Sequence, residues 1–254
     1  MGAFAVVEFC FILAVAMLGV MGLLIARRWL AERNSERRKA EDRLLSKAYL
    51  RRVAGSQEDV AADIAQPEKR LKVILRLIEL LRGTERERLI EIARTDGLLV
   101  APLRKIHSIS AAHRIESIRV LSACQGADCI SALTERMEND SNDIVRMEAA
   151  LALADMGCLP PPREAAAMLG GYGHSITLLH KAVFRSLATL HTGEMRDMLG
   201  DRMPHPFRAL ILETLGWSHN HEVFATLRRA SFFGDPDIRS AAARAMTELG
   251  HPAA

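Results

Sequence analysis

The chain has 254 residues, of which 49% are hydrophobic and 5% aromatic, and its formal net charge is +3. This length suits one or two domains, and the scarcity of aromatic residues disfavours a surface on which nucleic-acid bases stack. The charge is unevenly distributed, because residues 27–52 carry a net +6 and residues 53–254 a net −2. The main part of the chain therefore lacks a general basic field, and we expect no nucleic-acid partner.

The first element in chain order is an apolar segment, residues 3–26, in which only Glu8 is charged. As a helix it would span roughly 36 Å, and a bilayer's hydrocarbon core is about 30 Å thick. A cleaved secretory signal is the alternative, but residues 1–8 hold no basic residue and the apolar run ends directly in Arg27. We therefore predict a single transmembrane helix within residues 1–27, which contacts the lipid bilayer through residues 3–26.

This helix has a stripe of small residues on one face. Glu8 lies eleven residues before Gly19, about three helical turns, so it falls on the same side. Small residues let helices approach closely in lipid, and an intramembrane carboxylate is costly unless it is paired, protonated or near the interface. The stripe is a candidate helix–helix contact. The alternative is that Glu8 only marks the outer interface of the membrane and that the glycines are incidental. Its residues are Glu8, Ala16, Gly19, Gly22 and Ala26.

A basic juxtamembrane stalk and linker is predicted over residues 28–66. The membrane helix is expected to run on into this charged helix, with or without a break near Asn34, and residues 54–66 form a polar linker or short helix. The excess of Lys and Arg in residues 27–52 places everything after the span in the cytoplasm, under the positive-inside rule. The protein is thus expected in the inner (cytoplasmic) membrane with its N-terminus outside. The same charges are either a solvated face or a contact with anionic headgroups.

From Pro67 onward one helical phrase recurs. "DIVRMEAALALADMG" (143–157) and "PDIRSAAARAMTELG" (236–250) share an acid, an apolar-Arg pair, an Ala-rich helix and a final Gly, and weaker copies make the spacing 28–34 residues. Shorter amphipathic segments lie between the copies, so each period is a helix pair. One pair cannot bury its apolar face alone, whereas stacked pairs form a continuous core. This pattern predicts an α-solenoid over residues 67–254.

The phrase resembles HEAT repeats, most closely the HEAT-like class first named from phycobilisome lyases. The residues that carry the resemblance are Asp143, Val145, Arg146, Ala149, Ala150, Leu153 and Gly157, with Asp237, Ile238, Arg239, Ala242, Ala243, Met246 and Gly250 in the second copy. The expected fold is all-α: an α-solenoid of HEAT-like helix pairs on one N-terminal transmembrane helix. In HEAT proteins the aspartate and arginine form a polar ladder between repeats. The resemblance implies that role for Asp143, Arg146, Asp237 and Arg239, and it implies a macromolecular binding surface.

Signatures of catalysis are absent from the sequence. It contains no Gly-rich phosphate loop, GxSxG, HExxH or paired CxxC motif. Cys124 and Cys129, with His107 and His113 upstream, lack the spacing of a zinc site, and in a reducing cytoplasm we expect buried thiols. We therefore predict no catalytic residue, no metal and no cofactor.

Charged residues recur on the outward side of the second helix of each pair, which should line the concave face. Either these are ordinary solvated charges, or they line a groove that binds an acidic peptide or a partner helix. The candidate contact residues are Arg119, Lys181, Arg185 and Arg244, with Glu116, Glu148 and Glu213 mixed among them.

These features favour a membrane-anchored cytoplasmic scaffold or adaptor that is not an enzyme and binds a membrane-associated protein partner. An auxiliary subunit of an envelope or polysaccharide-export machinery is one concrete form. The alternative is a HEAT-like lyase or modification factor acting on a protein-bound ligand, which would need a pocket lined by acidic and His residues.

Overall fold

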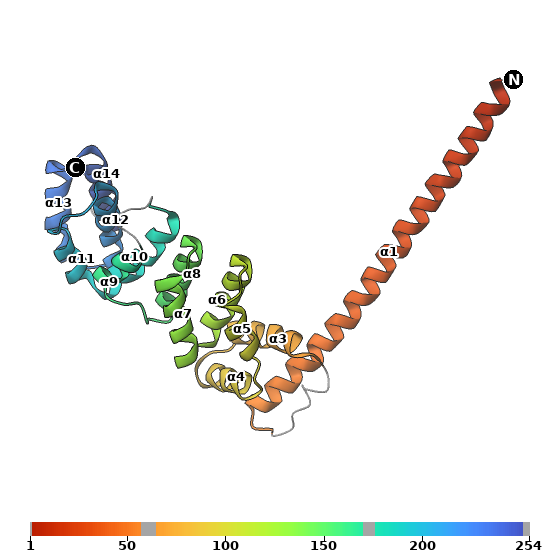
Figure 1. Ribbon diagram of the computed structural model, residues 1–254, viewed down its shortest axis with the longest axis horizontal. Coiled ribbons are helices and arrows are strands. Elements are labelled where there is room, and N and C mark those ends of the chain that lie inside the picture. The colour runs from red at the N-terminus through yellow and green to blue at the C-terminus, as the bar shows by residue number, and fades with distance from the viewer. Residues whose placement is uncertain (1, 57–64, 170–175, 251–254) are drawn as a thin grey trace. The chain divides into compact units, whose positions relative to one another are not determined.

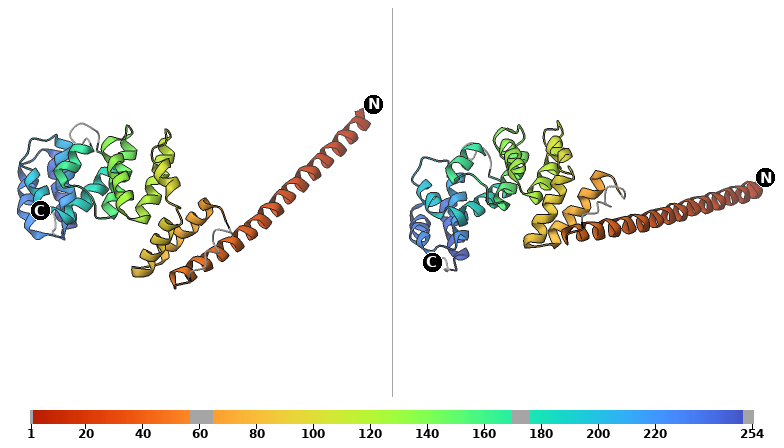
Figure 2. Two further views of the ribbon diagram at one scale, coloured as in Figure 1. Left: turned by 60° about the horizontal axis from the view of Figure 1, so that its bottom comes forward. Right: turned by 90° about the horizontal axis from the view of Figure 1, so that it is seen from below.

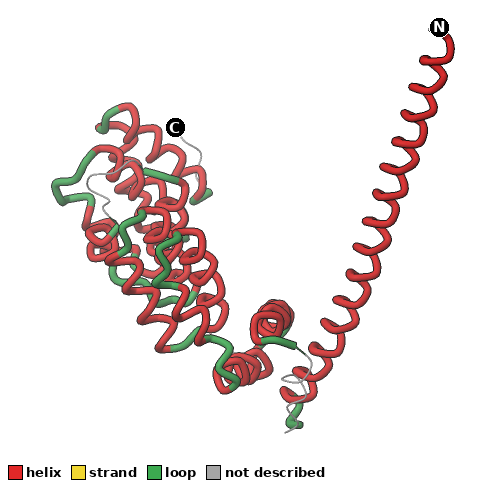
Figure 3. The backbone as a smooth tube through the Cα atoms, turned by 45° about the vertical axis from the view of Figure 1, so that its right-hand side comes forward, coloured by secondary structure: helices red, strands yellow, loops and turns green. Residues whose placement is uncertain are grey.

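A computed structural model describes the backbone of residues 2–56, 65–169 and 176–250. Within these helices, a few side chains lie outside the described set: those of residues 2–16, 18, 26, 30–35, 37 and 38. The described chain is all-α and contains no strand, as the tube in Figure 3 makes visible. The predicted fold class is confirmed at this level.

The chain forms two compact units, Met1–Leu98 and Leu99–Ala254. The first unit groups α3 (Pro67–Leu80) and α4 (Gly83–Thr95) with α1 (Gly2–Val53), which contacts both. The domain boundary predicted from the sequence lies after residue 66, where the helical pattern begins. The compact units divide after Leu98 instead, because the end of α1 packs against α3 and α4.

Helix α1 runs without interruption through Asn34 and measures about 78 Å at 1.5 Å per residue. Near its C-terminal end Leu45, Tyr49 and Val53 are buried, at spacings of four residues that place them on one face. Helix α3 supplies the facing surface with Ile74, and a proline at its first position suits the start of a helix. The C-terminal end of α1 is thus part of a small core.

The described part of the apolar segment of α1 is exposed (Figure 1). Its large side chains, which are 58–70% exposed, are those of Met17, Val20, Met21, Leu23, Leu24 and Ile25. Most of the predicted span, including Glu8, Ala16 and Ala26, lies outside the described side chains. Among the residues that are described, no helix meets the length and hydropathy expected of a membrane span.

In the second unit, five helices form a row in which each contacts the next (Figures 1 and 2). We call them the second-helix row. Each coincides with one copy of the repeated phrase, and their succession is compatible with a helical solenoid. The row consists of α6 (Ala111–Cys124), α8 (Asp143–Asp155), α10 (Leu178–Leu190), α12 (His205–Leu215) and α14 (Pro236–Glu248).

Shorter helices pack beside this row. Helix α5 contacts α6, α7 contacts α8, α9 contacts α11, α11 contacts α10 and α12, and α13 contacts α14. Helices α9 and α11 have seven residues each. The bounds are α5 (Val100–Lys105), α7 (Ala127–Asn139), α9 (Pro162–Met168), α11 (Thr192–Met198) and α13 (Phe224–Phe233), with 3₁₀ turns η1 (Gly216–Ser218) and η2 (His221–Val223) before α13.

Small residues allow the row to pack closely. Ala149 of α8 and Ala242 of α14 are fully buried, as expected for positions where helices approach each other. Gly216, directly after α12, lies against α14: an added Cβ would stand 2.6 Å from the carbonyl oxygen and 2.7 Å from the Cα of Ala245. Only glycine fits at such a distance, so this residue sets the approach of α12 to α14.

Candidate functional site

A buried ion pair joins consecutive helix pairs in the second unit. Arg114 projects from α6, and Asp140 lies in the turn before α8. The Nε and Nη2 atoms of Arg114 each lie 2.8 Å from one carboxylate oxygen of Asp140, and both residues are buried. The backbone N–H of Asn142 also donates to this carboxylate at 2.9 Å. This pair has the geometry of a ladder contact between repeats.

The four residues predicted for the ladder are placed differently. Arg146 donates to the carbonyl oxygen of Asp140 at 3.0 Å and pairs at 2.6 Å with Asp143 of its own helix. Arg239 donates to the carbonyl oxygen of Gly234 at 3.4 Å, and Asp237 lines a pocket described below. Both arginines therefore bind within their own repeat. The reason is that helical side chains point back toward the N-terminus, where the carbonyl groups of the preceding turn lie.

This backbone contact recurs along the second-helix row. Arg114, Arg146, Arg208 and Arg239 each donate to a carbonyl oxygen five to seven residues upstream, at 2.8–3.4 Å. In α10, His180 stands in the corresponding place and shares a capping box with Thr177. The repeated arginine therefore fastens α6, α8, α12 and α14 to the turns that precede them, which is a structural role.

The first unit contains a similar buried cluster that sequence reasoning missed. Arg70 of α3 pairs with Asp96, 26 residues later, and this is also the separation of Arg114 from Asp140. Arg52 of α1 binds the same carboxylate at 2.8 and 3.0 Å, and Arg70 Nε donates to the Tyr49 hydroxyl at 2.8 Å. Burial raises the pKa of Tyr49.

A signal for this cluster was available in the sequence. Pro67 precedes Arg70 by three residues, just as Pro236 precedes Arg239. The two helices thus share this Pro–Arg spacing, although α3 belongs to the other compact unit.

Three of the four predicted partner-contact residues form ion pairs between neighbouring helices of the row. Arg119 of α6 lies 3.3 Å from Glu148 of α8. Glu213 of α12 receives Lys181 of α10 at 2.8 Å on one carboxylate oxygen and Arg244 of α14 at 3.1 Å on the other. Glu148 and Glu213, two of the acids that the sequence places among these cations, therefore neutralise them.

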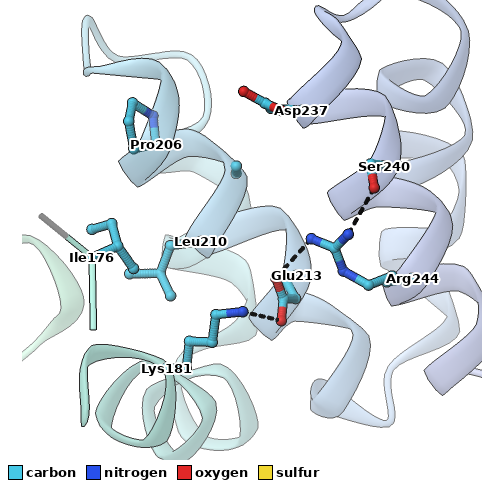
Figure 4. A pocket seen from close by; sticks show the side chains of 9 residues that line it. Ile176, Lys181, Pro206, Leu210, Glu213, Asp237, Ser240 and Arg244 are labelled. Carbon is cyan, nitrogen blue, oxygen red and sulfur yellow. Dashed lines mark hydrogen bonds and ion pairs between the residues drawn. The ribbon is translucent and has the colours of Figure 1, made fainter. Parts of the chain in front are cut away.

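Glu213 is the centre of this arrangement, between Lys181 and Arg244 (Figure 4). Partial burial raises the pKa of its carboxyl group, but the hydrogen bonds and positive charges of the two cations outweigh burial and hold the pKa below its ordinary value. Arg244 also donates to the Ser240 hydroxyl at 2.7 Å. The carboxylate is consequently charged at neutral pH and holds three helices in register.

A pocket of about 320 Å³ opens beside Glu213 (Figure 4). Apolar side chains, among them Ile176 and Leu210, line one part of it, and the charged groups of the bridge line another. Asp237, at the N-terminal end of α14, contributes a second carboxylate. The pocket therefore offers an apolar surface and fixed charges of both signs, contributed by three successive helices of the row.

Arg185, the fourth predicted contact residue, lies one turn after Lys181 on α10. Its guanidinium carbon lies 4.2 Å from the centre of the Trp217 ring, a cation–π geometry. The side chain is exposed and forms no ion pair among the described residues. Stacking occupies the face of the guanidinium and leaves its N–H edge available for a carboxylate.

The predicted membrane-helix contact lies mainly outside the described residues, since the side chains of Glu8, Ala16 and Ala26 do. At Gly19 and Gly22 an added Cβ would meet no atom within 4 Å. Both positions thus have open space around them on α1.

Metal-ligating side chains do not gather in the described part of the chain, where no group of three or more His, Cys, Asp or Glu could hold an ion. Among the cysteines described there, Cys124 and Cys129 are buried and Cys158 is exposed.

No family model matches the chain, and no curated protein matches it significantly. The fold places it among all-α proteins and is compatible with a helical-repeat solenoid.

Proposed function

We propose that this protein is a membrane-anchored HEAT-like scaffold that binds a protein partner on the exposed face of α10, α12 and α14. The observation that carries the proposal is the pocket beside the Lys181–Glu213–Arg244 bridge. Fixed charges and an apolar surface contributed by three successive helices suit recognition of a polypeptide segment, because little side-chain freedom remains to be lost on binding.

The partner segment is proposed to bear a carboxylate that binds Arg185. This guanidinium is held by Trp217 and is not neutralised by an acid in the described chain, in contrast to Lys181 and Arg244. A planar guanidinium can bind a carboxylate through two parallel hydrogen bonds, which gives directional recognition.

The anchor is proposed to be the apolar segment 3–26, with the N-terminus outside and the domain in the cytoplasm. The segment is followed directly by Arg27 and Arg28, and the apolar side chains described between Met17 and Ile25 are exposed. Trp29, which is 56% exposed, stands where an interfacial aromatic residue belongs.

Affinity purification of the full chain from membranes in mild detergent tests the scaffold. Wild-type protein should retain a stoichiometric partner, and Arg185→Glu should lose it, because a carboxylate at this site repels the proposed ligand group. Arg196→Glu, the same charge reversal at an exposed position of α11, is the matched control. Equal recovery of the partner with both variants would exclude Arg185 from the proposed contact.

Topology tests the anchor independently. A reporter that works only in the cytoplasm should be active when it is fused after Ala254. A strong signal from an alkaline-phosphatase fusion, which works only in the periplasm, would reverse the proposed orientation.

The double variant Gly19→Leu with Gly22→Leu tests the small-residue stripe. It should still insert into the membrane but lose self-association or partner binding if the stripe is a helix contact.

A further inference from the structure

The last short helix of the second unit, α13, presents aromatic side chains to solvent. Phe232 is 61% exposed and Phe233 is 86% exposed. Arg228 and Arg229, one turn earlier, are also exposed, and the sequence of α13 contains no acid. Leu227 is the one buried residue of the helix.

These four side chains share one face of α13. At about 100° per residue, they fall within an arc of roughly 140° centred opposite Leu227. Since α13 packs on α14, this arc points away from that contact. We call Arg228, Arg229, Phe232 and Phe233 the α13 face.

The α13 face combines exposed aromatic rings with exposed cations. Neither Arg228 nor Arg229 forms an ion pair within the described residues, and the nearest downstream acid, Asp235, pairs with His205 at 2.5 Å. Neither arginine of the α13 face is thus neutralised by an ion pair among the described residues, and both of its phenylalanine rings are exposed.

We propose that the α13 face binds the headgroup region of an anionic bilayer. Arginine N–H groups pair with lipid phosphates, while phenylalanine rings enter the boundary between headgroups and acyl chains. The absence of acid from the helix matches the negative potential of such a surface. This proposal rests on the membrane anchor proposed above, because tethering to the same bilayer raises the effective concentration of a weak contact.

The test uses the full chain incorporated into nanodiscs of phosphatidylcholine alone or with phosphatidylglycerol. Hydrogen–deuterium exchange of residues 224–233 is the measurement. Exchange should be at least several-fold slower in the anionic discs, and Arg228→Gln with Arg229→Gln should abolish the difference. Glutamine retains the helix propensity while removing the charge. Arg163→Gln with Arg196→Gln, two exposed positions on α9 and α11, removes the same charge elsewhere and should leave the difference intact.

Equal exchange of α13 in both kinds of disc would overturn the proposal. Protection that follows protein concentration instead of lipid charge would also overturn it, in favour of self-association. If the chain fails to enter the discs, the anchor is refuted separately. The α13 face is then assayed by co-sedimentation with anionic vesicles, where wild-type protein should pellet and the double glutamine variant should not.

Discussion

Arg114 and Asp140, 26 residues apart, form a buried ion pair in which two guanidinium nitrogens each lie 2.8 Å from a carboxylate oxygen. The pair links α6 to the turn before α8. A buried pair contributes little compared with apolar side chains of the same volume, yet removing one partner is costly because the other charge stays buried.

We therefore expect Asp140→Ala to destabilise the second unit by about 3–5 kcal/mol. Asp143→Ala, which removes the exposed partner of Arg146, should cost less than about 1 kcal/mol. Thermal unfolding of the full chain in detergent, followed by circular dichroism, measures both. Similar losses in the two variants would contradict the assignment of Asp140 as the ladder acid.

Replacing Glu213 with glutamine should destabilise the second unit by about 1–2 kcal/mol, because Lys181 and Arg244 lose their shared counter-charge. The pKa of this carboxyl is lowered in the folded state. Its contribution is thus present above the ordinary value of 4.5 and lost as the pH falls through the folded-state pKa.

Unfolding measured as the pH is lowered from 7 should show wild type and Glu213→Gln converging as the pH falls through the folded-state pKa of Glu213. Glu248→Gln, at an exposed position of α14, is the control. A gap between wild type and Glu213→Gln that does not narrow as the pH falls would show that charge is not the cause.

Gly216→Ala should destabilise the second unit by about 1–3 kcal/mol through overpacking. Its Cβ would lie 2.6 Å from a backbone atom of Ala245, which cannot move without displacing α14. Gly193→Ala in α11 is the matched control, because its Cβ would meet nothing within 4 Å, and it should be neutral or stabilising by up to about 1 kcal/mol. Urea unfolding distinguishes them, and equal effects would contradict the close approach.

Tyr49→Phe should loosen the contact of α1 with α3, at a cost of about 1–3 kcal/mol, since the hydrogen bond from buried Arg70 loses its acceptor. Hydrogen exchange of the end of α1 reports this loss. Arg76→Ala, which breaks the exposed α1–α3 ion pair with Asp42, is the control and should change exchange little.

The raised pKa of Tyr49 adds a test at high pH. A group with a raised folded-state pKa contributes stability below its ordinary pKa of 10.0 and loses it as the pH rises through the folded value. Wild-type protein should therefore approach Tyr49→Phe in stability above pH 10, and a constant difference would contradict this origin.

The helices of the second-helix row could be located from the sequence, because a stacked repeat requires the same docking surface in each unit. Ala149 and Ala242 stand at the same place in the two strong copies of the phrase, and both are buried.

The position of each arginine was determined by the sequence, whereas its partner was decided by tertiary structure. Arg146 can reach an acid three residues earlier, a carbonyl of the preceding turn or the next repeat, and local spacing does not separate these options. Asp140, in a turn outside the helical pattern, becomes the ladder acid only because the stacking of α6 on α8 brings Arg114 to it.

The same distinction holds for the candidate site. The amino-acid sequence by itself determined that cations and acids alternate along the outward side of the repeated helices. Only the tertiary structure decided that Glu213 lies between Lys181 and Arg244, which are 32 and 31 residues from it, and that Arg185 stacks on Trp217. Pairing across helices depends on distances of a few ångströms between side chains, and these arise from how whole helices pack, whereas the repeat period depends on residues within each helix.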